Sequence, residues 1–251
     1  QQDRVVYAEI RFAPLLHTQR GLGPEEVVEA VLAATREGMG MSGVEARLIL
    51  CTLRRFDEAQ SLQTARLADH FRGTLVAGLD LAGDEAGYPL DAHIKAFEYA
   101  FSRGIPCTAH AGEAKGAGNI RETLSHLRPQ RIGHGVRCVE DTSVIKELLE
   151  RGIHLELCPT SNIQVNVFKR LQDHQVDVLF KKGLSLSINT DGRTLSDTTL
   201  QKEYRKLENA FGWRPEHFIK CNLQALSHAF APPGLKEQIR RRLMAAYAPE
   251  S

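Results

Sequence analysis

Residues 105–113 have the sequence IPCTAHAGE, a short apolar run that leads into a histidine, a glycine and a carboxylate. The run Ile105–Ala109 has the length of a buried strand and is too short for a helix. Gly112 then allows the chain to turn, and Glu113 follows that turn. This pattern predicts a strand with His110 at its mouth, beside a group able to move a proton. A buried histidine next to a solvated glutamate fits the same residues, so the remainder of the chain has to decide.

The composition of the whole chain is typical of a globular protein. Of its 251 residues, 42% are hydrophobic and 25% are charged, and the formal net charge is +1. This near-neutral charge gives no reason to expect attraction to nucleic acid or to an anionic membrane surface. No apolar run approaches the roughly 20 residues that a transmembrane helix needs. The expected partner is therefore a small molecule, and the sequence sets no oligomeric state.

The cysteines are odd in number and scattered along the chain. They are Cys51, Cys107, Cys138, Cys158 and Cys221. Most of them lie in or beside apolar runs, which favours buried, reduced side chains over a disulfide framework or a CxxC zinc site. This usage indicates a reducing compartment, and we expect a cytoplasmic protein.

Apolar runs of strand length alternate along the chain with segments of helical spacing. The expected strands are Val5–Phe12, Val44–Cys51, Leu75–Leu81, Ile105–Ala109, Arg131–Gly133, His154–Cys158 and Leu184–Asn189. The expected helices are one that begins at Pro24, then Phe56–Phe71, Asp91–Arg103, Asn119–Leu127, Asp141–Arg151, Val176–Lys182, Thr198–Phe211, Glu216–Phe230 and Pro233–Tyr247. A polar loop is expected between Pro159 and Val176. The alternation predicts parallel βα units.

The positions of the polar residues distinguish a closed barrel from a doubly wound open sheet. The carboxyl ends of different expected strands carry Glu9, Arg11, Asp80, His110, His134 and Asp191. In a (β/α)8 barrel these ends converge on one mouth, whereas an open sheet spreads them out at roughly 4.8 Å per strand. We therefore predict a TIM-type (β/α)8 barrel with C-terminal helices, forming one domain over residues 1–251. About seven strands are found where this barrel has eight, so we expect the first βα unit to precede Gln1.

Four side chains at the predicted mouth form a candidate metal-dependent site: His110, Glu113, His134 and Asp191. Neutral imidazole and carboxylate are ligands that suit zinc and leave a position open for water. Zinc makes its bound water acidic near neutral pH, which supplies a hydroxide nucleophile. A nearby histidine can accept the proton of that water, and a glutamate can deliver a proton to the substrate. The residues thus favour metal-assisted hydrolysis.

Six stretches resemble, in order and spacing, the adenosine deaminase family, a branch of the amidohydrolase-type zinc barrels. They are YAEIRFAP (Tyr7–Pro14), LDLAGDE (Leu79–Glu85), TAHAGE (Thr108–Glu113), RIGHG (Arg131–Gly135), LCPTSN (Leu157–Asn162) and NTD (Asn189–Asp191). The closing segment Asn222–Tyr247 also resembles the last helices of that family. Each stretch alone is a weak signal, whereas the ordered set is specific and covers essentially the whole chain.

The resemblance implies roles for five residues. His110 and Asp191 would bind one zinc ion, and Asp191 would also hold the attacking hydroxide against the substrate. Glu113 would protonate N1 of the purine, and His134 would orient and deprotonate the water. Gly83 would hydrogen-bond the purine N3 through its backbone. The implied reaction is hydrolysis of adenosine and 2′-deoxyadenosine, with adenosine giving inosine and ammonia in purine nucleoside salvage.

The other polar residues of these stretches are expected to have structural roles. Glu9 and Arg11 are expected to form a buried ion pair. Pro159 and Asn162 are expected to shape a turn, with Ser161 as a hydrogen-bond donor to the site residues.

Two departures from the family pattern keep alternatives open. Nothing before Tyr7 contains the His-x-His pair that supplies two zinc ligands in the family, so the chain alone is expected to be inactive. Gly192 stands where many members carry a second acid that contacts the purine N7. A deaminase of another 6-aminopurine nucleoside, such as aminodeoxyfutalosine or an N6-modified adenosine, therefore stays an alternative. A non-catalytic relative without bound zinc is a further one.

Overall fold

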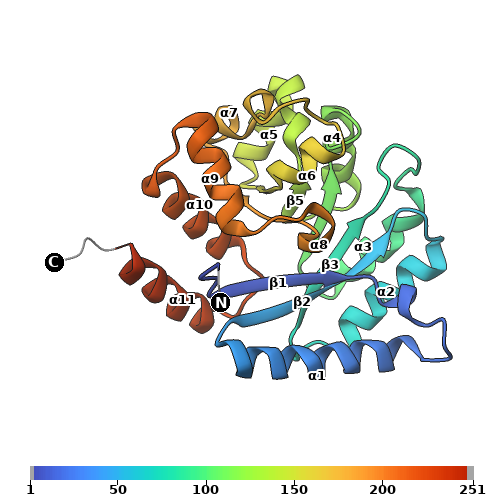
Figure 1. Ribbon diagram of the computed structural model, residues 1–251. Helices are drawn as coiled ribbons and strands as arrows, with labels where there is room; N and C mark the ends of the chain where they lie inside the picture. Colours follow the sequence, from blue (N-terminus) through green and yellow to red (C-terminus); the bar gives the residue numbers. More distant parts are fainter. Residues whose placement is uncertain (1–2, 248–251) are drawn as a thin grey trace. The chain divides into compact units, whose positions relative to one another are not determined.

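The computed structural model describes residues 3–247 of the chain (Figure 1). The chain comprises two compact units. The first consists of Gln1–His110 with Thr123–Pro129, and the second of Ala111–Glu122 with Gln130–Ser251. Among the described residues there are seven strands, and those paired within each unit are parallel, as the sequence predicts. No helix within residues 3–247 is long and apolar enough to span a membrane.

The first unit holds four strands that are neighbours in chain order. They are β1 (Tyr7–Phe12), β2 (Glu45–Leu53), β3 (Val76–Ala82) and β4 (Cys107–Ala111), of which only the last residue of β4 belongs to the second unit. The connecting helices are α1 (Pro24–Ser42), α2 (Glu58–His70) and α3 (Ile94–Ser102). Leu50 lies opposite Leu79 in the sheet, and Leu79 lies opposite Cys107.

Alternate residues of these strands build the core of the first unit. Leu48 and Leu50 on β2 and Leu79 on β3 are fully buried, and they belong to one apolar cluster with Leu32 of α1 and Phe97 of α3. Successive strand residues point to opposite faces of a sheet, so the residues between these leucines face the other way. That opposite face carries Arg11 of β1 and Asp80 of β3, which form an ion pair.

The second unit holds three strands and most of the helices. Its strands are β5 (Arg131–His134), β6 (His154–Leu157) and β7 (Leu186–Ile188). Its helices are α4 (Ala117–His126, up to Glu122), α5 (Thr142–Glu150), α6 (Pro159–Gln164), α7 (Val176–Lys181), α8 (Arg193–Ser196), α9 (Leu200–Phe211), α10 (Pro215–His228) and α11 (Pro233–Ala246). The strands are again neighbours in chain order, as the expected βα units require.

The largest departure from the predicted elements follows β6. The sequence predicts a polar loop from Pro159 to Val176, but helix α6 occupies Pro159–Gln164, so the prediction is wrong there. Proline suits the first position of a helix because its φ is already close to helical and no N–H is left unpaired. β4 also ends at Ala111 instead of Ala109, which puts His110 inside the strand. The other predicted boundaries match or differ by at most three residues, and the largest difference is at α3, which begins at Ile94 where the sequence predicts Asp91.

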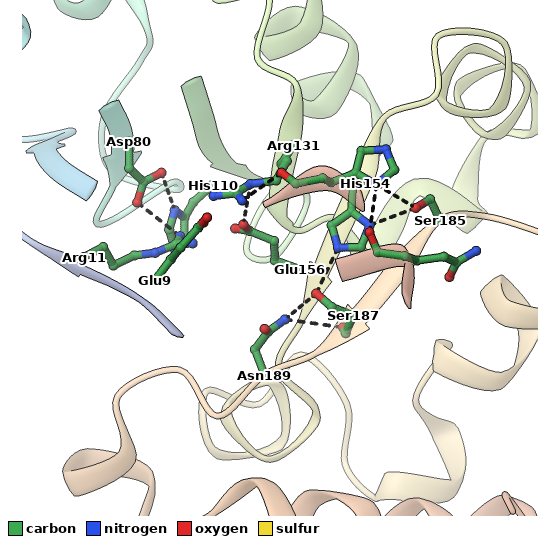
Figure 2. Close-up of polar contacts among 12 residues, drawn as sticks. Glu9, Arg11, Asp80, His110, Arg131, His154, Glu156, Ser185, Ser187 and Asn189 are labelled. Carbon is green, nitrogen blue, oxygen red and sulfur yellow. Dashed lines mark hydrogen bonds and ion pairs between the residues drawn. The ribbon is translucent and has the colours of Figure 1, made fainter. Parts of the chain in front are cut away.

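A buried polar cluster lies on one face of β6 and β7 in the second unit (Figure 2). The imidazole of His154 contacts the hydroxyl of Ser185 through Nδ1 at 2.8 Å and the hydroxyl of Ser187 through Nε2 at 3.0 Å. The side chain of Asn189 donates to the same hydroxyl of Ser187 at 2.9 Å. These contacts tie β6 to β7 just before the chain reaches Asp191.

Acid should weaken the second unit through His154. Burial lowers the pKa of His154 to about 3, the positive charges of His228 and Arg131 act in the same direction, and Glu156 opposes them. The unfolded state therefore binds more protons than the native state between about pH 6.5 and pH 3. The free energy of unfolding should fall as the pH drops through this range, by up to about 1.4 kcal/mol per pH unit from this side chain.

The test is guanidinium unfolding of the wild type and His154→Gln at several pH values. The wild type should lose stability more steeply toward low pH than the variant, because only the wild type carries this buried imidazole. Parallel curves for the two proteins would show that His154 does not titrate in this way.

Candidate active site

His110 is held in the first unit by two groups on its Nδ1 side. Its Nδ1 lies 3.0 Å from the carbonyl oxygen of Leu81. The same atom lies 3.2 Å from Oδ1 of Asp80 (Figure 2). Both partners are acceptors, so Nδ1 carries the ring proton and Nε2 keeps its lone pair. A carboxylate or carbonyl on one ring nitrogen is the arrangement that orients a histidine for metal binding through the other. His110 is therefore oriented to offer the lone pair of Nε2 to a metal ion.

Asp80 also binds Arg11, across the same sheet. Nη1 of Arg11 lies 3.2 Å from Oδ2 of Asp80 and 3.3 Å from Nε2 of His110. Asp80 is fully buried, and the guanidinium supplies the opposite charge that a buried carboxylate needs. The sequence suggests Glu9 as the partner of Arg11. Arg11 forms an ion pair with Asp80, and Glu9 accepts a hydrogen bond from the hydroxyl of Tyr7 at 2.7 Å. The expected pair of Glu9 with Arg11 stays a prediction.

Glu113 and His134 are brought together in the second unit. His134 ends β5 and is only 3% exposed, and its Nδ1 lies 3.3 Å from Oε1 of Glu113. Gly112 makes this approach feasible because its φ is +71°, and a Cβ there would lie 2.4 Å from the side chain of Ile120. The sequence thus correctly predicts Gly112 as the turn that presents Glu113.

Asn162 lies between these two side chains, which the sequence does not predict. Its Nδ2 is 2.7 Å from Oε1 of Glu113 and 3.1 Å from Nδ1 of His134. The expectation that Asn162 only shapes a turn is wrong, because the residue lies inside helix α6 and is fully buried. A short polar stretch after proline carries no local signal for such distant partners.

Asp191 follows β7 and contacts α6 through Ser161, the residue before Asn162. The hydroxyl of Ser161 donates to Oδ2 of Asp191 at 2.8 Å, which confirms the expected donor role of Ser161. Asp191 has a φ of +55° and His134 a φ of +61°. Non-glycine residues avoid this left-handed region, and those held there cluster at functional sites. Two of the four residues singled out from the sequence thus have a strained backbone.

Gly83 follows β3 in the first unit. Its φ is +101°, and a Cβ on it would lie 3.4 Å from the backbone nitrogen of Arg54. The residue is exposed, so its backbone is open to a ligand. Of the predicted site residues, Gly83 and His110 belong to the first unit. Glu113, His134 and Asp191 belong to the second.

A cavity of about 600 Å³ opens beside Glu113 within the second unit. Its wall mixes apolar side chains, among them Val136, Val165 and Phe168, with the charged side chains of Arg137 and Glu140. This volume is in the range of small-molecule sites.

The donor types of the chain fit zinc, although their number does not complete a site. His110 offers a neutral imidazole and Asp191 a carboxylate, both common zinc ligands. Within residues 3–247 no three His, Cys, Asp or Glu side chains gather closely enough to hold a metal ion. The chain as described therefore provides part of a ligand set.

The sequence model of the adenosine deaminase family matches residues 1–246. The chain belongs to the adenosine deaminase family. It is 39% identical over 245 residues to the adenosine deaminase of Mycobacterium sp. (strain JLS), a match that covers 92% of this chain and 67% of the relative. It is 35% identical over 243 residues to the adenosine deaminase of Clostridium acetobutylicum, covering 97% of this chain and 72% of the relative.

Two solved structures place the fold within this family. The adenine deaminase of Arthrobacter aurescens is 28% identical, with a TM-score of 0.90 over 98% of this chain and 75% of that chain. The N6-mAMP deaminase of Arabidopsis is 26% identical, with a TM-score of 0.87 over 96% of this chain and 73% of that chain. These matches confirm the TIM-type barrel class. They also make this member of the adenosine deaminase family a hydrolytic purine deaminase.

Proposed function

We propose that the protein hydrolyses adenosine, and 2′-deoxyadenosine, at C6 of the purine, giving inosine from adenosine together with ammonia. The observation that carries the proposal is the contact between Glu113 and His134, together with a cavity beside Glu113 whose volume suits a small molecule. The named adenosine deaminases of Mycobacterium and Clostridium support this substrate. We place the reaction in purine nucleoside salvage in the cytoplasm, consistent with the buried free thiols of all five cysteines.

The chemistry divides between an acid and a base in the second unit. Glu113 donates its carboxyl proton to N1 of the purine, which makes C6 electrophilic. His134 accepts a proton from the water that attacks C6 and holds that water in line. His134 passes its proton to the amino group, which leaves C6 as ammonia, and C6 becomes the carbonyl carbon of inosine as its hydroxyl proton restores the carboxyl of Glu113. Buried donors around the reacting atoms need no reorganisation during these steps.

Gly83 binds the purine, and Asp191 orients the attacking oxygen. The backbone N–H of Gly83 donates to N3 of the purine. His110 and Asp191 would contribute ligands to one zinc ion, which when bound supplies acidity to water near neutral pH. Asp80 supports the first of these ligands from the Nδ1 side, at 3.2 Å.

A second candidate function is deamination of a different 6-aminopurine, and Gly192 is the residue that supports it. Gly192 has an ordinary φ of −70°, and a Cβ on it would meet only Leu195, at 3.4 Å or more. The backbone therefore does not require glycine at this position, so its identity bears on substrate choice. Adenine and N6-mAMP, the substrates in the names of the two structural matches, are the natural competitors.

The proposal is tested by ammonia release from a panel of adenosine, 2′-deoxyadenosine, adenine, AMP, N6-methyl-AMP and aminodeoxyfutalosine. With the full-length protein, adenosine and 2′-deoxyadenosine should each give a kcat/KM at least about 10-fold above adenine, AMP, N6-methyl-AMP and aminodeoxyfutalosine. Gly192→Asp is the matched variant, because an aspartate side chain at this position requires no shift of the backbone. A higher kcat/KM for adenine or N6-methyl-AMP would support the second candidate, and no ammonia from any compound would contradict both.

A further inference from the structure

The amide of Asn162 joins three side chains from different parts of the second unit. Its Nδ2 reaches Oε1 of Glu113 at 2.7 Å and Nδ1 of His134 at 3.1 Å. Its Oδ1 lies 3.1 Å from Nε2 of His174. Asn162 is fully buried and His174 is 2% exposed, so bulk water does not compete for these contacts.

The imidazole of His174 carries one N–H, and its hydrogen bonds show which ring nitrogen holds it. Burial lowers the pKa of His174 to about 3, so the ring is neutral at physiological pH. Its Nδ1 accepts a hydrogen bond from the backbone N–H of Val176 at 3.0 Å. A neutral imidazole has one N–H, so the proton of His174 is on Nε2, facing Asn162.

This tautomer determines which end of the Asn162 amide faces the catalytic pair. The Nε2–H of His174 requires an acceptor, and only the Oδ1 end of the amide provides one. A flipped amide would place its NH₂ group against another N–H and its oxygen against the carboxylate of Glu113. Both contacts are unfavourable in a buried site. His174 therefore directs both amide N–H groups of Asn162 toward Glu113 and His134.

We propose that Asn162 is a positioning residue for proton transfer from Glu113, and that His174 sets its orientation. Because Oε1 of Glu113 accepts from Asn162, the transferable proton resides on Oε2. The Oε2–H bond breaks, an N1–H bond forms on the purine, and the negative charge left on Glu113 is stabilised by the amide N–H. His134 fits either tautomer, since its Nδ1 has Asn162 as donor and Glu113 as acceptor. The inference rests on the proposed function.

Asn162→Ala and Asn162→Asp test this role by kinetics on whichever 6-aminopurine the wild type deaminates best. Each should lower kcat by about 10- to 100-fold, the effect of losing a hydrogen bond to a charged group, and change KM by less than about 3-fold. Gln164→Ala is the matched control. It removes another amide of α6, whose hydrogen bond goes to the carbonyl of Ser196, and should leave kcat unchanged. A loss confined to KM, or kcat within about 2-fold of wild type, would overturn the proposal.

The orienting role of His174 has its own comparison. His174→Leu removes the N–H, whereas His174→Gln places an amide N–H near the position of Nε2. The leucine variant should lose kcat as Asn162→Ala does, the glutamine variant should recover most of it, and the double variant Asn162→Ala/His174→Leu should be no worse than either single one. Additive losses, or no recovery with glutamine, would mean that His174 acts only through packing.

Nitrogen NMR of His174 in the wild type separates this inference from the deaminase proposal. The inference requires a neutral ring protonated at Nε2 from about pH 6 to pH 8, whatever the substrate. An Nδ1–H tautomer or a charged ring would overturn it even in an active enzyme. Absence of any deaminase activity combined with the expected tautomer would sink the proposed function and the catalytic role, while the orientation of Asn162 would stand.

Discussion

Replacing Glu113 by glutamine is expected to lower kcat on adenosine by about 10³-fold, within the range that a general acid contributes. Glutamine has nearly the same shape, and its side-chain oxygen can still accept from Asn162, which lies 2.7 Å from Oε1 in the wild type. Its amide cannot deliver a proton to N1, so the purine stays unactivated. KM should change little, because the contacts that bind the substrate are retained.

The measurement is steady-state ammonia release, with zinc content determined on the same preparations. Glu150→Gln is the control: it neutralises an exposed carboxylate on α5, whose ion pair is with Lys146 at 3.6 Å, and should behave as wild type. If Glu113→Gln keeps kcat within about 10-fold of wild type, Glu113 is not the proton donor. If it loses zinc as well as activity, the loss of turnover no longer isolates proton transfer.

The sequence locates β4 but misplaces its ends, and the reason is physical. Pro106 has no N–H to give to the sheet, so the strand proper starts at Cys107, although the carbonyl of Pro106 still accepts from the N–H of Leu79 at 2.9 Å. At the other end, the strand continues through His110 and Ala111. In the sequence, a polar residue at the end of an apolar run suggests that a loop begins. One face of this sheet is polar, so His110 can lie within the strand.

The sequence singles out four candidate site residues because they share one local signature. His110, Glu113, His134 and Asp191 each stand at the end of a short apolar run, close to a glycine. The left-handed backbone at His134 and Asp191 has no such signature, since a non-glycine residue rarely adopts it and the surrounding structure must enforce it.

Asp80, Asn162 and His174 show where sequence reasoning stops. Asp80 lies 30 residues from the histidine that it contacts, and Asn162 lies 49 residues from Glu113. Their roles depend on side chains that only the folded sheet brings near. Helix α6 is too short for a helical repeat to be visible, so its proline is the one local signal that points to a helix.

Replacing His110 by alanine is expected to remove the metal from the full-length protein. The Nδ1–H of His110 donates to the carbonyl oxygen of Leu81 and to Asp80, which orients Nε2 to act as a ligand. Zinc content after dialysis should fall from about one ion per chain to well below it, and turnover should fall with it. His126→Ala, which removes an exposed histidine at the end of α4, should retain both.

Asp80→Asn provides the graded case between these two variants. Asparagine keeps a side-chain oxygen near Nδ1 of His110 but loses the charge that also binds Arg11, at 3.2 Å. Loss of such a supporting group typically weakens metal binding by about 10- to 100-fold. Zinc affinity should therefore rank wild type above Asp80→Asn and Asp80→Asn above His110→Ala. Full zinc occupancy in His110→Ala would show that the metal is held without this histidine, and the ligand role of His110 would then be wrong.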